Sequence, residues 1–121
     1  MKFTREISSV TTIRRVSGNA IVVGNNRFTE TIALTPDGLV DDFSPPPLDE
    51  LAISHFEILL EDEPELLILG TGARAVFPPR ELTFAFARRR IGLEVMDTAA
   101  AARTFNVLAG EGRRLAAVLD L

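Results

Sequence analysis

The residues whose types could support chemistry lie in two short stretches of the sequence. One is a glycine-rich turn that follows an apolar run, and the other is a polar series within and after an alanine-rich segment. Their members are Gly70, Thr71, Gly72, Thr98, Asn106, Glu111 and Arg113. If both stretches follow parallel strands, these groups line a crevice at the carboxyl ends of the strands, where open α/β sheets bind ligands. One hypothesis is therefore a small-ligand-binding protein or an enzyme.

The same polar residues also have ordinary structural roles. The hydroxyl of Thr98 can accept a hydrogen bond from an unpaired backbone amide at the start of a helix. We expect Asn106 to bond the turn Gly70–Gly72. Glu111 and Arg113 flank the entry to the last strand, where a paired charge would fix the loop. The residue types alone leave the structural and the functional interpretation open.

The glycines of this turn do not complete a nucleotide-binding fingerprint. A Gly-x-Gly pattern after a strand is how such a turn begins, but the third glycine is absent here. Pro78 and Pro79 also lack the amide hydrogens with which a helix start would hold a phosphate. We therefore expect no bound nucleotide and no other cofactor.

No set of residues spells out a catalytic site or a metal site. The chain has no cysteine, which excludes a thiolate nucleophile and thiolate metal ligands. Its single histidine, His55, has no partner group nearby in the sequence with which to act as an acid or base. The acidic residues between Glu57 and Glu65 do not repeat the pattern of a calcium-binding loop. We predict no catalytic residue and no metal.

A helix within Asp97–Arg113 organises the predicted fold. Its alanines and leucine favour helix, and Asp97 can cap the first turn. The flanking apolar runs Ile91–Met96 and Leu115–Leu119 are short and rich in branched residues, which is typical of buried strands. Strand, helix and strand make a βαβ unit, in which the strands are parallel and the crossover is right-handed.

The rest of the chain adds strands and two more helices. Residues 10–34 predict a β-meander with Gly/Asn-rich turns, whose third strand is the alternating segment Phe28–Leu34. Leu66–Leu69 predicts another buried strand, and Pro79–Arg90 a crossover helix. A capping box at Ser54–Glu57 predicts a short helix to about residue 62. The fold class is α/β: an N-terminal β-meander followed by a βαβαβ unit, with a mixed central sheet covered by helices.

The loop Asp37–Asp49 is the segment best suited to contact a partner. It is long for a compact domain and contains three consecutive prolines, which restrict its backbone before any binding event. Phe43 and Leu48 are its candidate contact residues. The alternative is that Phe43 folds back on the edge of the sheet as part of the core.

Composition indicates one globular domain, residues 1–121, with 46% hydrophobic and 25% charged residues. A net charge of −4 disfavours nucleic-acid binding, which depends on cationic contacts to phosphate. No apolar run reaches the length of a membrane span, so we expect no membrane insertion. The polar start Met1–Glu6 does not read as a signal sequence, and we expect a cytoplasmic protein.

Two motifs resemble a widespread small α/β domain family. They comprise Leu66, Ile68, Leu69, Gly70, Thr71 and Gly72, followed by Val95, Met96, Thr98, Ala101, Thr104, Phe105, Asn106, Leu108, Glu111 and Arg113. The resemblance covers nearly the whole chain, and the family includes the mitochondrial respiratory complex I assembly factor three and many uncharacterised bacterial proteins. Phe105 departs from the tyrosine that is frequent there, which removes a hydroxyl. The resemblance implies a compact scaffold without an established catalytic activity, used for protein interaction in the mitochondrial branch.

Two functions therefore compete. The leading hypothesis is a non-enzymatic scaffold or protein-interaction and assembly module with an unidentified protein partner, and a homo-oligomer is compatible with it. The rival is the small-ligand-binding protein or enzyme described above. A polar crevice holding an ordered anion would favour the rival, whereas a broad apolar surface patch would favour the module.

Overall fold

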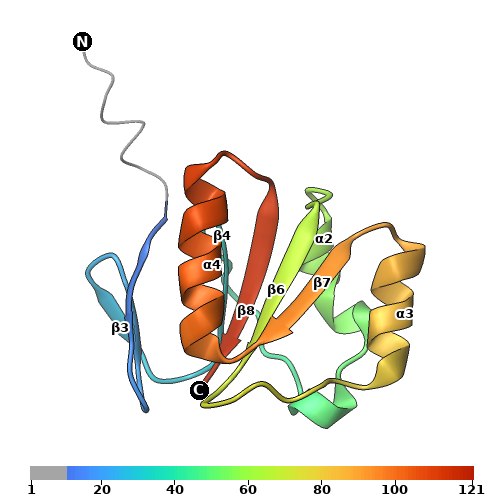
Figure 1. Cartoon of the computed structure of the whole chain (residues 1–121), viewed down its shortest axis with the longest axis horizontal. Coiled ribbons are helices and arrows are strands. Elements are labelled where there is room, and N and C mark those ends of the chain that lie inside the picture. Colours follow the sequence, from blue (N-terminus) through green and yellow to red (C-terminus); the bar gives the residue numbers. More distant parts are fainter. Residues whose placement is uncertain (1–10) are drawn as a thin grey trace.

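The computed structural model describes residues 11–121, which form two β-sheets with helices packed around them (Figure 1). The smaller sheet has three antiparallel strands, β1 (Ile13–Val16), β2 (Ile21–Val23) and β3 (Asn26–Phe28), in the order β1-β2-β3. Its two turns lie at the Gly/Asn-rich positions that the sequence indicated. The predicted meander is confirmed over these strands, and Val10, where it was expected to begin, lies outside the described residues.

The larger sheet has five strands in the order β5-β4-β8-β6-β7. Its parallel strands are β6 (Leu66–Thr71), β7 (Gly92–Met96) and β8 (Leu115–Asp120). β4 (Ile32–Thr35) pairs antiparallel with β8, and β5 (Gly38–Leu39) pairs antiparallel with β4. The predicted α/β class with a mixed sheet is therefore confirmed. Because β6, β7 and β8 are parallel neighbours, their carboxyl ends meet at one edge of the molecule (Figure 1).

The segment Phe28–Leu34 does not form the single strand that was predicted, because it is divided between the two sheets. β3 ends at Phe28, and β4 begins at Ile32 in the larger sheet. Ile32, Ala33 and Leu34 are all buried, since β4 is covered on both faces. In a strand that is covered on both faces, apolar and polar residues need not alternate. The alternation over Phe28–Leu34 therefore did not mark a single strand.

The helical elements are η1 (Leu48–Glu50), η2 (Ile53–Phe56), α2 (Glu57–Leu60), α3 (Arg80–Arg88) and α4 (Thr98–Gly110), where η denotes a 3-10 helix. The helices predicted within 79–90 and 97–113 are confirmed as α3 and α4. The capping box predicted at Ser54–Glu57 is wrong. Instead, the backbone amide of Ala52 donates to Nδ1 of His55 at 3.0 Å, so the single histidine braces the short η2 turn.

Two clusters of buried side chains join the layers. One lies between α4, the smaller sheet and one face of the larger sheet, and includes Ile68 and Phe105. The other lies on the opposite face of the larger sheet, beneath η2, α2 and α3. In it the rings of Phe56 and Phe86 meet edge to face, with centroids 5.3 Å apart. α4 therefore contacts both sheets and sets their relative position (Figure 1).

Candidate functional site

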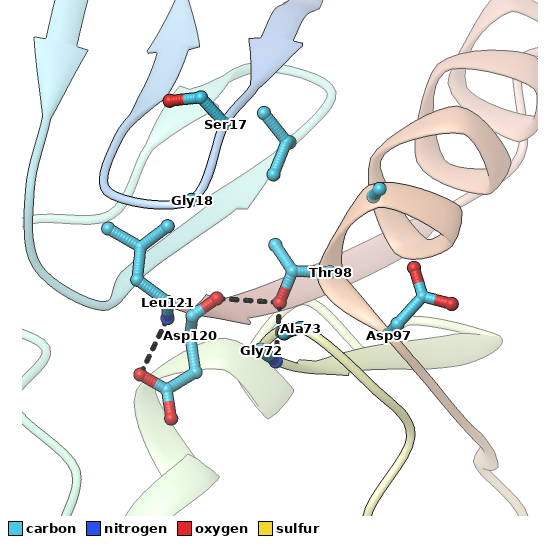
Figure 2. A pocket seen from close by; sticks show the side chains of 10 residues that line it. Ser17, Gly18, Gly72, Ala73, Asp97, Thr98, Asp120 and Leu121 are labelled. Atoms are coloured by element: carbon cyan, nitrogen blue, oxygen red, sulfur yellow. Dashed lines mark hydrogen bonds between the residues drawn. The ribbon is translucent and has the colours of Figure 1, made fainter.

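Thr98, the first residue of α4, connects the ends of two parallel strands. Its Oγ1 accepts the backbone amide of Gly72 at 2.8 Å and donates to the carbonyl oxygen of Asp120 at 2.6 Å (Figure 2). The backbone amide of Thr98 in turn donates to the carbonyl of Gly72 at 2.9 Å. The residue is only 1% exposed. The hydroxyl predicted to serve the helix start instead ties β6 to β8.

Gly70 allows α4 to approach β6 closely enough for these bonds. A Cβ atom at this position would lie 3.0 Å from the Cβ of Ala101 and 3.0 Å from both Cα and Oγ1 of Thr98. Gly72 has a different reason to be glycine, because its φ of +102° is rarely adopted by residues with a side chain. Both glycines of the turn are thus explained by backbone geometry.

Thr71 orders the loop that leaves this turn toward α3. Its hydroxyl donates to the carbonyl of Arg74 at 2.7 Å and accepts the amide of Val76 at 2.9 Å. The members Gly70, Thr71 and Gly72 of the predicted set therefore do lie together with Thr98. The contacts that join them are internal to the fold.

A cleft of about 390 Å³ opens beside Thr98, where the carboxyl ends of the strands meet. It lies between the β1–β2 turn, the start of α4 and the ends of β6 and β8 (Figure 2). Its lining consists of Val16, Ser17, Gly18, Gly72, Ala73, Asp97, Thr98, Ala99, Asp120 and Leu121. The location agrees with the crevice expected for an open α/β sheet.

The carboxylates of the cleft already make bonds within the protein. Asp97 caps α4 as predicted, because its Oδ1 accepts the amide of Ala100 at 2.8 Å. Asp120 accepts the hydroxyl of Thr31 and the amide of Leu121, each at 2.8 Å. Among the described residues, the lining contains no histidine, lysine or arginine. Such a cleft, with two carboxylates in its lining, can attract a cation.

Asn106 lies elsewhere, and the prediction that it bonds the turn Gly70–Gly72 is wrong. Its Oδ1 accepts the amide of Ile13 at 2.9 Å, and its Nδ2 donates to the carbonyl of Ile13 at 2.8 Å. The residue faces β1 because it projects from the side of α4 that packs on the smaller sheet. The side chain therefore joins helix to sheet, away from the cleft.

Glu111 and Arg113 lie at the opposite end of α4, before the start of β8. The expected pairing of Arg113 with Glu111 is wrong. Arg113 pairs with Glu65 instead, at 2.9 Å between Nε and Oε1. Both partners of this ion pair are well exposed, with side-chain exposures of 45% and 42%. The predicted set of polar residues is thus distributed along the length of α4 and is not gathered in one place.

The proposed partner loop is folded against the second core cluster. The ring of Phe43 lies 6.2 Å from that of Phe56, and both Phe43 and Leu48 are partly buried against the cluster. This packing corresponds to the alternative in which Phe43 supports the core. A role of the loop in partner binding stays a prediction.

Two residues that contribute to these contacts were missed from the sequence. Asp120 supplies the carbonyl that Thr98 bonds, and Ile13 supplies the backbone groups that Asn106 holds. A signal existed for Asp120, because it is the polar residue that ends an apolar strand, as Thr71 is. The two stand side by side in the register of β6 and β8. No signal in the sequence pointed to a backbone contact at Ile13.

Two further observations bear on the chemistry of the described region. Within residues 11–121, no three histidine, aspartate or glutamate side chains gather so that they could hold a metal ion. No helix in the same region is both long and apolar enough to cross a bilayer.

Comparison with known proteins gives a family and several relatives. Residues 13–119 match the family described as "Protein of unknown function (DUF498/DUF598)". The chain is 33% identical over 119 residues to NADH dehydrogenase (ubiquinone) 1 alpha subcomplex assembly factor 3 of Danio rerio, covering 95% of this chain and 67% of that protein. It is 29% identical over 66 residues to the "13 kDa major membrane protein" of Francisella tularensis, and this alignment spans only 54% of each protein.

Solved structures share the fold over nearly the whole chain. A protein of Xanthomonas campestris, solved by NMR, is 39% identical and superposes with a TM-score of 0.83, covering 91% of this chain and 83% of that one. A Bordetella pertussis protein described as an Mth938-like domain is 28% identical, with a TM-score of 0.73 and coverage of 93% and 87%. The two-sheet arrangement is therefore that of the Mth938-like structures.

Proposed function

Because the chain belongs to the family of unknown function DUF498/DUF598, whose relatives include assembly factors of NADH dehydrogenase, we propose that it is a non-enzymatic module that binds another protein during the assembly of a complex. The partner is proposed to be a subunit of that complex. The alignment with the assembly factor extends over 95% of this chain, so the whole domain corresponds to the aligned part of the relative.

The observation that carries this proposal is the use of the polar groups at the carboxyl ends of the strands. The hydroxyl of Thr98 has both a donor and an acceptor inside the fold. The carboxylates of Asp97 and Asp120 accept internal donors as well. These bonds give the three side chains a structural role in holding the strands and α4 together. A structural role for these groups supports a function at the surface of the domain.

The loop 37–49 is the proposed contact with the partner. Phe43 anchors the loop by packing on Phe56, which leaves a stiff, proline-containing segment with Leu48 at its end. A segment that is already ordered loses little entropy on binding. Its acidic neighbours Asp41, Asp42 and Asp49 favour a partner surface that carries positive charge.

Purification of a chromosomally tagged protein from its own cells tests the proposal. With the wild-type chain, we expect one partner protein to be recovered in a fixed ratio to the tagged chain. Leu48→Asp is expected to lower the amount of this partner. Val107→Asp, on the exposed side of α4, is the control and is expected to leave that amount unchanged. Recovery of the chain alone, at the yield of the folded protein, would contradict the proposal. Fractionation of the same cells tests the proposed cytoplasmic location. The membrane fraction is the alternative, because the Francisella relative is named a membrane protein.

A second candidate function is binding of a small cation in the cleft beside Thr98. The supporting observation is the pair of carboxylates, Asp97 and Asp120, in a cleft of about 390 Å³ whose lining has no basic side chain among residues 11–121. Titration with a polyamine, followed by NMR shifts of the Gly72 and Ala73 amides, tests it. Shifts confined to the cleft and lost in Asp97→Asn would favour this function, and unchanged spectra would exclude it for this ligand class.

A further inference from the structure

Most of the strongly exposed apolar side chains among the described residues belong to α2, to α3 or to the segment between β6 and α3. Five large hydrophobic residues are strongly exposed, and four of them belong to α2, to α3 or to the loop that leads into α3. These four are Ile58 (46% exposed), Val76, Phe77 (86%) and Phe84 (52%). The fifth, Val107, is 59% exposed and lies on α4, over the other face of the larger sheet. Ile58 and Phe84 lie on α2 and α3, and they are the two apolar residues of the surface considered below.

The outer side of α3 combines this apolar surface with positive charge. Leu82 and Phe86 turn inward and are buried in the second core cluster. Arg80, Phe84 and Arg88 follow one another at intervals of one helical turn, so they form a stripe on the opposite, exposed side. The stripe places an exposed aromatic ring between two guanidinium groups.

The outer side of α2 combines apolar surface with negative charge. Leu59 and Leu60 are buried in the same cluster as the inward side of α3, while Ile58 is exposed. Glu57 and Glu61 lie one helical turn apart and are both exposed. The two helices are neighbours, because Glu57 forms an ion pair of 3.2 Å with Arg89 at the end of α3.

Acidic and basic residues are also separated along the sequence on either side of β6. No lysine or arginine occurs between Asp37 and Glu65, a segment that contains acidic residues throughout. Between Arg74 and Arg90 the only acidic residue is Glu81, among five arginines. An acidic segment and a basic segment therefore lie next to each other on one layer of the fold, with apolar side chains exposed on both.

We propose that this surface, the α2–α3 face, binds a second copy of the same chain. The face is formed by Glu57, Ile58, Glu61, Arg80, Phe84 and Arg88. A two-fold axis between α2 and α3 places the basic stripe of each copy opposite the acidic side of the other, with Ile58 and Phe84 meeting near the axis. Contacts of this type are self-complementary, as in most symmetric dimers. A nucleic acid or an anionic membrane would be repelled by the acidic half of the face, whereas a second copy satisfies both halves.

Sedimentation velocity over a range of concentrations tests the proposal directly. We expect a reversible dimer that weakens at high salt, because exposed ion pairs are screened. Phe84→Ala is expected to raise the dissociation constant by about tenfold or more, as loss of a central aromatic residue does. Val107→Ala is the control and is expected to leave the dimer unchanged. Circular dichroism and the thermal midpoint show whether each variant is folded.

A charge exchange between two variants distinguishes this face from any other dimer contact. Arg80→Glu/Arg88→Glu and Glu57→Lys/Glu61→Lys are each expected to be monomeric alone and to form a heterodimer when mixed. A wild-type chain that is monomeric at all concentrations overturns the proposal. So does a dimer that persists in both double variants, since it would use another surface. The proposed binding of a partner protein through the loop 37–49 is independent of either result.

Discussion

The side chain of Asn106 holds Ile13 by both of its backbone polar groups. The amide nitrogen of Asn106 donates to the carbonyl of Ile13 at 2.8 Å, and its oxygen accepts the amide of Ile13 at 2.9 Å. The side chain thus takes the place that a neighbouring strand would occupy beside β1. Because Asn106 lies on α4, which also packs on the larger sheet, this pair of bonds attaches the smaller sheet to the rest of the domain.

Asn106→Ala is expected to lower the free energy of unfolding by about 1–3 kcal/mol, because it leaves the backbone groups of Ile13 without partners in a half-buried place. Hydrogen exchange should be accelerated first at the amides of β1. Arg113→Ala is the comparison. Its ion pair with Glu65 is exposed, so its loss is expected to cost less than about 1 kcal/mol. Equal denaturation midpoints for Asn106→Ala and wild type would refute the anchoring role.

Thr98→Val is expected to lower the free energy of unfolding by about 1–3 kcal/mol. Valine has nearly the same shape as threonine but no hydroxyl, so the amide of Gly72 and the carbonyl of Asp120 lose their partner. Thr98→Ser keeps the hydroxyl and is expected to lose much less. Urea denaturation of the two variants decides the matter. Equal stability of the Thr98→Val and Thr98→Ser variants would show that the hydroxyl does not join β6 to β8.

Gly70→Ala is expected to destabilise by about 1–3 kcal/mol, because the added methyl group would press on α4 at Ala101 and Thr98. Gly110→Ala, at the exposed end of α4, is the control. A Cβ there meets no atom within 4 Å, and alanine favours helix, so its stability is expected to be unchanged or raised by up to about 1 kcal/mol. Thermal midpoints of both variants give the comparison, and a neutral Gly70→Ala would show that α4 can shift without cost.

Phe43→Ala is expected to reduce stability by roughly half of the about 3–5 kcal/mol that a buried phenylalanine loses on truncation, because its ring is only partly buried against Phe56. Phe77→Ala removes a ring that is 86% exposed and should change the midpoint little. Chemical denaturation of both variants checks the difference. Equal, small effects would mean that Phe43 does not anchor its loop.

The elements of the fold could be predicted where one local pattern dominates. The alanine-rich sequence and Asp97 indicated α4 and its cap, and the apolar runs on either side indicated the parallel strands β7 and β8. The sequence did not indicate that the chain changes sheets after Phe28. That change depends on which layers cover β4, and burial on both faces is a property of the assembled fold.

The candidate site could be predicted only in part. Thr98 and the turn Gly70–Gly72 lie together, because they stand at the carboxyl ends of the neighbouring parallel strands β7 and β6. The partners of Asn106 and Arg113 could not be predicted, since Ile13 and Glu65 are distant in sequence and lie on other elements. Side-chain type limits what a residue can bond, but the packing of α4 decides which group it meets.

Crosslinking in living cells shows whether this domain binds another protein, as proposed. A photo-crosslinking amino acid is placed at Leu48 in the loop 37–49, and at Val107 on the exposed side of α4 as a control. A covalent adduct with one different protein is expected at position 48, and none is expected at position 107. The absence of any adduct at position 48, in cells where the variant is folded and expressed at the normal level, would contradict the proposed binding.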